Sequence, residues 1–141
     1  MIKYMRFDIE SFIRDSVKWD GEIQDLKADL DAISELKAIE QSVGKSSNIS
    51  DPTFSTASEY DKVKVKIDRL VTYQAAFRHA FSKLSEAQKE VIELFFFQGG
   101  MKGRLVYDYS RKWALNTKAV YAERRKALNL MREIIEERYE L

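Results

Sequence analysis

Residues 108–120 read DYSRKWALNTKAV, and the chain continues to residue 135 as YAERRKALNLMREII. A short segment that ends near Trp113 is followed by a longer amphipathic segment that begins after Asn116. Asn is a favoured N-cap residue, because its side chain accepts a hydrogen bond from a free N–H of the first helical turn. The pattern therefore predicts a short helix, a tight turn and a second helix, which is the layout of a helix-turn-helix.

The apolar residues of this stretch recur at helical spacing. Tyr109, Trp113 and Leu115 supply apolar positions around the turn. The buried stripe of the second helix is expected to be Val120, Ala127, Leu128, Met131 and Ile135. Trp113 is expected to be mostly buried and to anchor the crossing of the two helices. The core that they share with earlier helices is expected to contain Leu84, Val91, Leu94, Trp113, Leu115, Val120 and Leu128.

The outward side of the second helix is rich in groups that could contact DNA. If this helix enters a major groove, the residues nearest the base edges are Asn116, Thr117, Lys118, Tyr121 and Arg124. The cations expected to meet phosphates are Lys102, Arg104, Arg111, Lys112, Arg125 and Lys126. The same periodicity also fits a basic amphipathic helix that packs on a neighbour, so periodicity leaves both interpretations open.

Positive charge is concentrated in the last third of the chain. The sequence has a formal net charge of +1, but residues 101–132 carry nine Lys or Arg residues against Asp108 and Glu123, a net of +7. Residues 1–60 carry seven basic and twelve acidic residues, a net of −5. A basic segment is expected on a surface that binds a polyanion, because Lys and Arg displace counterions from phosphates. Charge alone is equally consistent with a solvated helical face.

No segment alternates with period two, so the predicted fold class is all-α, with a helical N-terminal region followed by a helix-turn-helix domain. Residues 1–43 are expected to form an acidic amphipathic region used for packing or oligomerisation. Residues 44–57, GKSSNISDPTFSTA, predict a linker. Residues 58–141 are expected to form a helical domain in which the helix-turn-helix occupies about residues 84–135.

The N-terminal region, residues 7–43, has an apolar stripe with steps of three and four, made of Trp19, Ile23, Leu26, Leu30 and Ile33. Gly21 interrupts it and predicts a fresh helix after Asp20. Since this region is acidic, we expect the stripe to pack within the chain rather than to contact DNA. A second copy of the chain and RNA polymerase are the alternative partners of the stripe.

Four helices are expected after the linker, over about residues 58–83, 85–97, 105–113 and 117–139. Ser85 and Gln88 have the spacing of a capping box, in which each residue's side chain bonds the other's backbone N–H. The sequence QGGMKG at residues 98–103 predicts a break before the third of these helices.

Catalytic and metal-binding chemistry has few candidate residues here. Cysteine is absent and His79 is the only histidine. Val43–Ser46 resembles the end of a phosphate-binding loop, but Ile39 stands where that loop requires glycine. We therefore expect no enzymatic activity, cofactor or metal. No apolar run approaches the ~18 residues needed to cross a membrane, and the first residues lack a signal peptide's apolar core, so we expect a cytoplasmic protein without a membrane partner.

The segment from Leu84 onward resembles region four of bacterial sigma factors. LSEAQKEVIELFFF, residues 84–97, is similar to the opening helix of that region. DYSRKWALNTKAV aligns without gaps on its core pattern, E-I-A-x-x-L-G-[ISV]-[ST]-x-x-[TA]-V, with Asp108 for the glutamate, Trp113 for the leucine and Asn116 for the capping hydroxyl. More specifically, AVYAERRKALNLM, residues 119–131, is similar to the recognition helix of the ArpU/RinA family of phage-encoded transcriptional regulators.

Two residues depart from the pattern. Ala114 stands where a turn glycine is usual, which predicts a longer or less strained turn. Glu123 stands where sigma factors often have an apolar residue, which predicts either a slightly rotated helix or a pair between Glu123 and a neighbouring arginine.

The resemblance implies a sequence-specific DNA-binding transcriptional regulator that acts on phage late or packaging genes inside a bacterial host. Its partner would be double-stranded DNA, with RNA polymerase and a second copy of the chain as further candidates. Two other classes remain open. A terminase small subunit would assemble into a large ring, and a helical adaptor protein would show no salt-dependent affinity for DNA.

Overall fold

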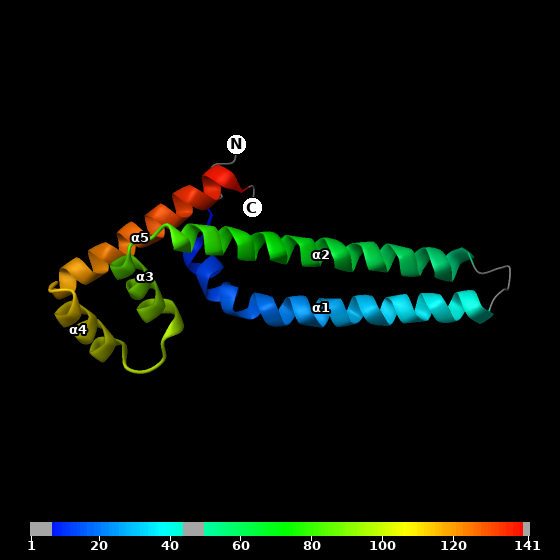
Figure 1. Cartoon of the computed structure of the whole chain (residues 1–141), viewed down its shortest axis with the longest axis horizontal. Coiled ribbons are helices and arrows are strands. Elements are labelled where there is room, and N and C mark those ends of the chain that lie inside the picture. Colours follow the sequence, from blue (N-terminus) through cyan, green and yellow to red (C-terminus); the bar gives the residue numbers. More distant parts are fainter. Residues whose placement is uncertain (1–6, 44–49, 140–141) are drawn as a thin grey trace. The chain divides into compact units, whose positions relative to one another are not determined.

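The computed structural model describes residues 7–43 and 50–139, and for residues 37–43 and 50–57 it describes the backbone only. All elements in these ranges are helical, which confirms the expected all-α class. In chain order they are α1 (Ile9–Val43), α2 (Ser50–Ser82), α3 (Glu86–Ile92), the π-helical turn η1 (Glu93–Phe97), α4 (Lys102–Lys112) and α5 (Thr117–Arg138). Figure 1 labels the α-helices.

Both long helices differ from the sequence prediction. α1 continues through Gly21, so the fresh helix expected after Asp20 is wrong; one interior glycine costs a helix only about 1 kcal/mol, which neighbouring turns can offset. α2 begins at Ser50 rather than near residue 58, so part of the expected linker is helical. Pro52 lies in the first turn of α2, where a missing N–H removes no intrahelical hydrogen bond. Residues 44–49 of that linker lie outside the described residues.

The chain divides into two compact units, and their boundaries differ from the expected ones. The hairpin unit is Lys18–Gln74, which contains most of α1 and most of α2. The composite unit joins Met1–Val17 to Ala75–Leu141. The first turns of α1 therefore belong with α3, α4 and α5, although the sequence assigned them to a separate N-terminal region.

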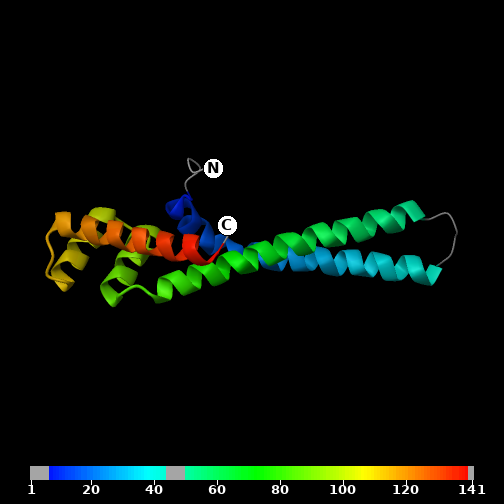
Figure 2. The ribbon, with the colours of Figure 1, turned by 90° about the horizontal axis from the view of Figure 1, so that it is seen from above.

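In the hairpin unit, the two helical segments lie side by side and antiparallel (Figures 1 and 2). Trp19 and Ile23 of α1 and Ile67 of α2 are buried, and the Trp19 ring centroid lies 5.7 Å from that of Tyr73. Intrachain packing of the apolar stripe is therefore confirmed at its Trp19 end. The later members of the stripe are only half-buried: Leu26, Leu30 and Ile33.

The core of the composite unit takes residues from each of its helices. From the expected core, the buried members are Leu84, Val91, Leu94, Val120 and Leu128. The start of α1 adds Ile9, Phe12 and Ile13, and α5 adds Ala127, Met131 and Ile135.

The expected deep burial of Trp113 is wrong, because this residue and Leu115 are only half-buried. The indole Nε1 of Trp113 donates a hydrogen bond to Glu90 Oε2 at 2.8 Å, which holds the ring at the surface. Tyr109, one turn earlier on α4, takes the inner place and is 5% exposed.

Ser85 begins α3 with the predicted capping box. The Ser85 hydroxyl accepts from the Gln88 N–H at 3.1 Å, and the Gln88 side chain accepts from the Ser85 N–H at 3.0 Å. The expected helix to Phe97 is α-helical only as far as Ile92 and then widens into η1. Such π turns are rare and occur frequently at functional sites.

A four-residue turn joins α4 to α5 and closes α4 with a Schellman motif. The Leu115 N–H donates to the Ser110 carbonyl at 2.8 Å and the Ala114 N–H to the Arg111 carbonyl at 3.4 Å. Ala114 has φ +54°, the left-handed conformation in which glycine is usual. The less strained turn that the sequence predicted is therefore not observed. Asn116 caps α5 as predicted, because its Oδ1 accepts from the Ala119 N–H at 2.7 Å.

Replacing Ala114 by Gly is expected to stabilise the protein by about 0.5–1 kcal/mol, because the left-handed penalty of alanine exceeds the extra backbone entropy of glycine. Urea unfolding of Ala114→Gly checks this. Ala122→Gly, inside α5, is the matched control and should lower stability by about 1 kcal/mol. Equal losses of stability in Ala114→Gly and Ala122→Gly would show that the left-handed conformation of Ala114 is not strained.

Candidate nucleic-acid interface

α5 has one face in the core and one in solvent. Val120 and Ala127 are fully buried, and α5 packs on both α3 and α4. Lys118 and Arg125 lie on the opposite side, are exposed, and make no ion pair within the described part of the chain. With 100° per residue in an α-helix, these two residues share a face, so their charges point outward together.

The expected base-proximal residues on the first turns of α5 are accessible. Asn116, Thr117 and Lys118 are exposed. The Asn116 Oδ1 is used by the helix cap, which leaves its amide NH₂ as the group that could reach a base edge. Tyr121 is 45% exposed, and its ring centroid lies 5.3 Å from that of the half-buried Phe95, so the ring packs on a neighbour while much of the side chain stays accessible.

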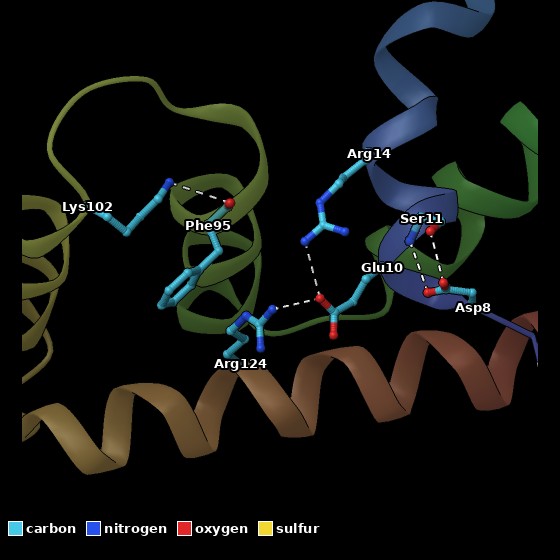
Figure 3. A network of polar contacts seen from close by, with 7 residues as sticks. All are labelled: Asp8, Glu10, Ser11, Arg14, Phe95, Lys102 and Arg124. Atoms are coloured by element: carbon cyan, nitrogen blue, oxygen red, sulfur yellow. Dashed lines mark hydrogen bonds and ion pairs between the residues drawn. The ribbon is translucent and has the colours of Figure 1, made fainter.

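Arg124 is not on the outward face that the sequence predicted. It lies midway between Val120 and Leu128, its buried i − 4 and i + 4 neighbours, so its side chain is directed inward and is only 26% exposed. Its Nη2 donates to Glu10 Oε1 at 3.0 Å (Figure 3). Its guanidinium also lies 5.1 Å from the Phe95 ring centroid. An arginine occupied in this way does not present its fork to a guanine edge.

Lys102 is also placed differently from its predicted role at phosphates. Its Nζ donates to the Leu94 carbonyl at 2.8 Å and to the Phe95 carbonyl at 3.5 Å, the contact drawn in Figure 3. The Nζ also lies 5.9 Å from the Phe95 ring centroid. Carbonyls near the end of a helix lack intrahelical donors, and a lysine ammonium can satisfy them. Lys102 therefore caps free carbonyl groups at the C-terminal end of the helical segment formed by α3 and η1.

The other cations expected at phosphates are on the surface of α4 and α5. The Arg111 Nη1 donates to the Tyr107 hydroxyl at 3.0 Å, and Arg104 pairs with Asp108 at 3.7 Å. Lys126 pairs with Glu123 at 3.4 Å. Glu123 thus pairs with a lysine rather than with a neighbouring arginine. These exposed pairs are weak, so their cations can exchange partners at little cost.

Two accessible residues were missed by the sequence reasoning. Tyr107 on α4 is 54% exposed and holds Arg111 through its hydroxyl. Asn129 is exposed one turn beyond Arg125 on α5. The i, i+4 spacing of Tyr107 with Arg111 and of Arg125 with Asn129 was the available signal for both.

Glu90 and Tyr109 fix the end of α4 against α3. The Glu90 carboxylate accepts from Lys112 Nζ and from Trp113 Nε1, and these hydrogen bonds hold the pKa of Glu90 below its ordinary value. The Tyr109 hydroxyl donates to the Ala87 carbonyl at 2.6 Å. Burial, with smaller contributions from the charges of Glu123 and Glu90, raises the pKa of Tyr109 to about 12, so the phenol stays a donor at neutral pH.

Other kinds of site have little support in the described residues. An open pocket of about 360 Å³ beside α4 is lined by Glu90, Glu93, Asp108 and Lys112, among others. Among the side chains that the structure describes, residues 7–36 and 58–139, no group of His, Cys, Asp or Glu has a metal-binding arrangement. No described helix is both long and apolar enough to cross a membrane.

Glu90→Gln is expected to lower stability at pH 7 by about 1 kcal/mol, because the charge-assisted contacts with Lys112 and Trp113 are weakened. Since folding lowers the pKa of Glu90 from 4.5, its ionised form stabilises the protein above that value. This contribution is lost as the pH falls through the folded-state pKa, so wild type and variant should converge in acid. Urea midpoints at several pH values test this. The exposed carboxylate of Glu93, changed to Gln, is the control and should show no such convergence.

Comparisons of the chain with family models, with curated proteins and with solved structures find no match. A function for this chain therefore has to be inferred from its own residues and their geometry.

Proposed function

We propose that the chain is a sequence-specific DNA-binding transcriptional regulator, with α4, the turn and α5 forming a helix-turn-helix. α5 would be the recognition helix and double-stranded DNA its partner. The resemblance of residues 84–135 to sigma region four and to ArpU/RinA regulators supports a phage-encoded protein that acts on late or packaging genes.

The single observation that carries the proposal is the outward face of α5 beside the end of α4. Lys118, Tyr121 and Arg125 are exposed there, while Val120 and Ala127 on the other side of the same helix are buried. A recognition helix needs this arrangement, in which the first turns offer polar groups to base edges while the opposite face is fixed by a core.

The exposed residues divide by the contact that each could make. Thr117, Lys118 and Tyr121 are nearest the N-terminus of α5 and would face base edges. Arg111 and Arg125 would meet phosphates, which set affinity and orientation without reading sequence. Arg111 donates to the exposed Tyr107 hydroxyl, a weak contact that its guanidinium could exchange for a phosphate at little cost.

The first test is selection of duplexes from a random pool by the wild-type protein, followed by titration of a selected duplex and its scrambled counterpart at several salt concentrations. Arg125→Ala is expected to weaken both duplexes alike and to lower the salt slope by about one, because one phosphate contact is lost. Arg138→Ala, at the exposed far end of α5, is the matched cation control and should leave the slope unchanged.

Tyr121→Ala is expected to weaken the selected duplex more than the scrambled one, by about 1–3 kcal/mol if the hydroxyl contacts a base. The salt slope should stay constant, because tyrosine carries no charge at neutral pH. If the wild type shows no salt-dependent affinity for any duplex, the proposal is wrong, and the adaptor interpretation replaces it.

A further inference from the structure

Arg124 occupies a position where an uncharged residue would be expected. Its row on α5 is buried before it at Val120 and after it at Leu128. Its Nε is buried and has no hydrogen-bond partner among the residues that the structure describes. An orphaned polar atom is unfavourable, and an apolar side chain of similar volume would fill the site without it. Stability of the fold therefore does not explain why a guanidinium occupies this position.

The contacts of the guanidinium fix the orientation of the Arg124 side chain. Its Nη2 donates to Glu10 at 3.0 Å, and its plane lies over two successive rings, 5.1 Å from the centroid of Phe95 and 5.5 Å from that of Phe96. We call Glu10, Phe95, Phe96 and Arg124 the Arg124 cluster. A planar, forked group held by a carboxylate and two ring faces allows less rotation than an aliphatic chain.

Each member of the cluster is itself held in place. The Asp8 carboxylate accepts from the Ser11 N–H at 3.2 Å and from its hydroxyl at 2.9 Å, which caps α1 immediately before Glu10 (Figure 3). These hydrogen bonds, the backbone one first, lower the pKa of Asp8, so the cap is charged at neutral pH. The two phenylalanines lie in η1, which Lys102 closes through the Leu94 carbonyl.

The cluster also reaches the proposed DNA-binding face. The Phe95 ring that lies under Arg124 is the ring against which Tyr121 packs, at 5.3 Å between centroids. A change in the position of Arg124 would therefore shift the Phe95 ring, and the Phe95 ring would shift Tyr121, which lies one turn before Arg124 on α5.

We propose that Arg124 is a positioning residue of the DNA interface. Through Glu10, Phe95 and Phe96 it fixes the rotation of α5, and with it the register in which Tyr121 meets base edges. Arg124 itself touches no DNA. This inference rests on the proposed function, and it gives the first turns of α1 a role in reading sequence.

The test measures the ratio of affinities for the selected and the scrambled duplex. Removing an acidic charge near DNA would ordinarily strengthen binding to both duplexes. Glu10→Gln is instead expected to lower the ratio about tenfold, and Arg124→Gln to do the same, as loss of one base contact would. The double variant should be no worse than either single one, because both act on one contact.

Two control variants separate the possible roles. Arg125→Gln removes an exposed neighbouring arginine and should lower the salt slope by about one, whereas Arg124→Gln should leave the slope unchanged. Arg14→Gln removes the other arginine that pairs with Glu10, at 3.4 Å. The Arg14 guanidinium also lies over the Phe96 ring. Since its side chain is 60% exposed, this change should alter the ratio less than about twofold.

Circular dichroism and urea unfolding establish that each variant is folded before binding is measured. If Arg124→Gln fails to fold, Arg124→Lys replaces it, because lysine keeps the charge but not the planar fork, and a lowered ratio is again expected. A salt slope lowered by Arg124→Gln, stronger binding of Glu10→Gln to both duplexes, or additive effects in the double variant would each overturn the positioning role alone. Absence of any salt-dependent binding by the wild type would overturn the proposed function as well.

Discussion

The composite unit depends on one constraint, the burial of a continuous stripe of α5 from Val120 to Ile135. This stripe is longer than α3 alone can cover, and the start of α1 supplies Ile9, Phe12 and Ile13 to the same core. The opposite side of α5 is left in solvent by the same geometry. An exposed polar face on a rigidly held helix is therefore a consequence of how the core is filled, and the proposed function uses that face.

Periodicity and capping were sufficient to predict how α3 and α5 begin and which face of α5 is buried. The capping box at Ser85 and the N-cap at Asn116 depend on residues three positions apart or fewer, so their signals are contained in the sequence itself. The apolar stripe of α5 was predicted for the same reason. The early start of α2 was not, because a segment rich in Ser and containing Pro52 has weak helix propensity and the helix forms despite it.

Long-range pairing could not be read from local patterns. Arg124 was assigned to the outward face, although its i − 4 and i + 4 neighbours Val120 and Leu128 are apolar. Its partner Glu10 lies 114 residues away. Trp113 was expected inside because of its size, and Glu90 draws its indole N–H outward instead. In each case the deciding partner lies on another helix, and periodicity carries no information about which helices meet.

The first turns of α1 share a compact unit with α5, which lies at the other end of the sequence, and this separation affects how the unit forms during biosynthesis. A ribosome delivers residues in order, so Ile9, Phe12 and Ile13 emerge long before the helix that helps to cover them. Until α5 is complete, the core that buries these apolar groups lacks one of its helices, and such incompletely covered segments favour aggregation. Maturation of the composite unit is therefore a late event, delayed by the high sequence separation of its contacts.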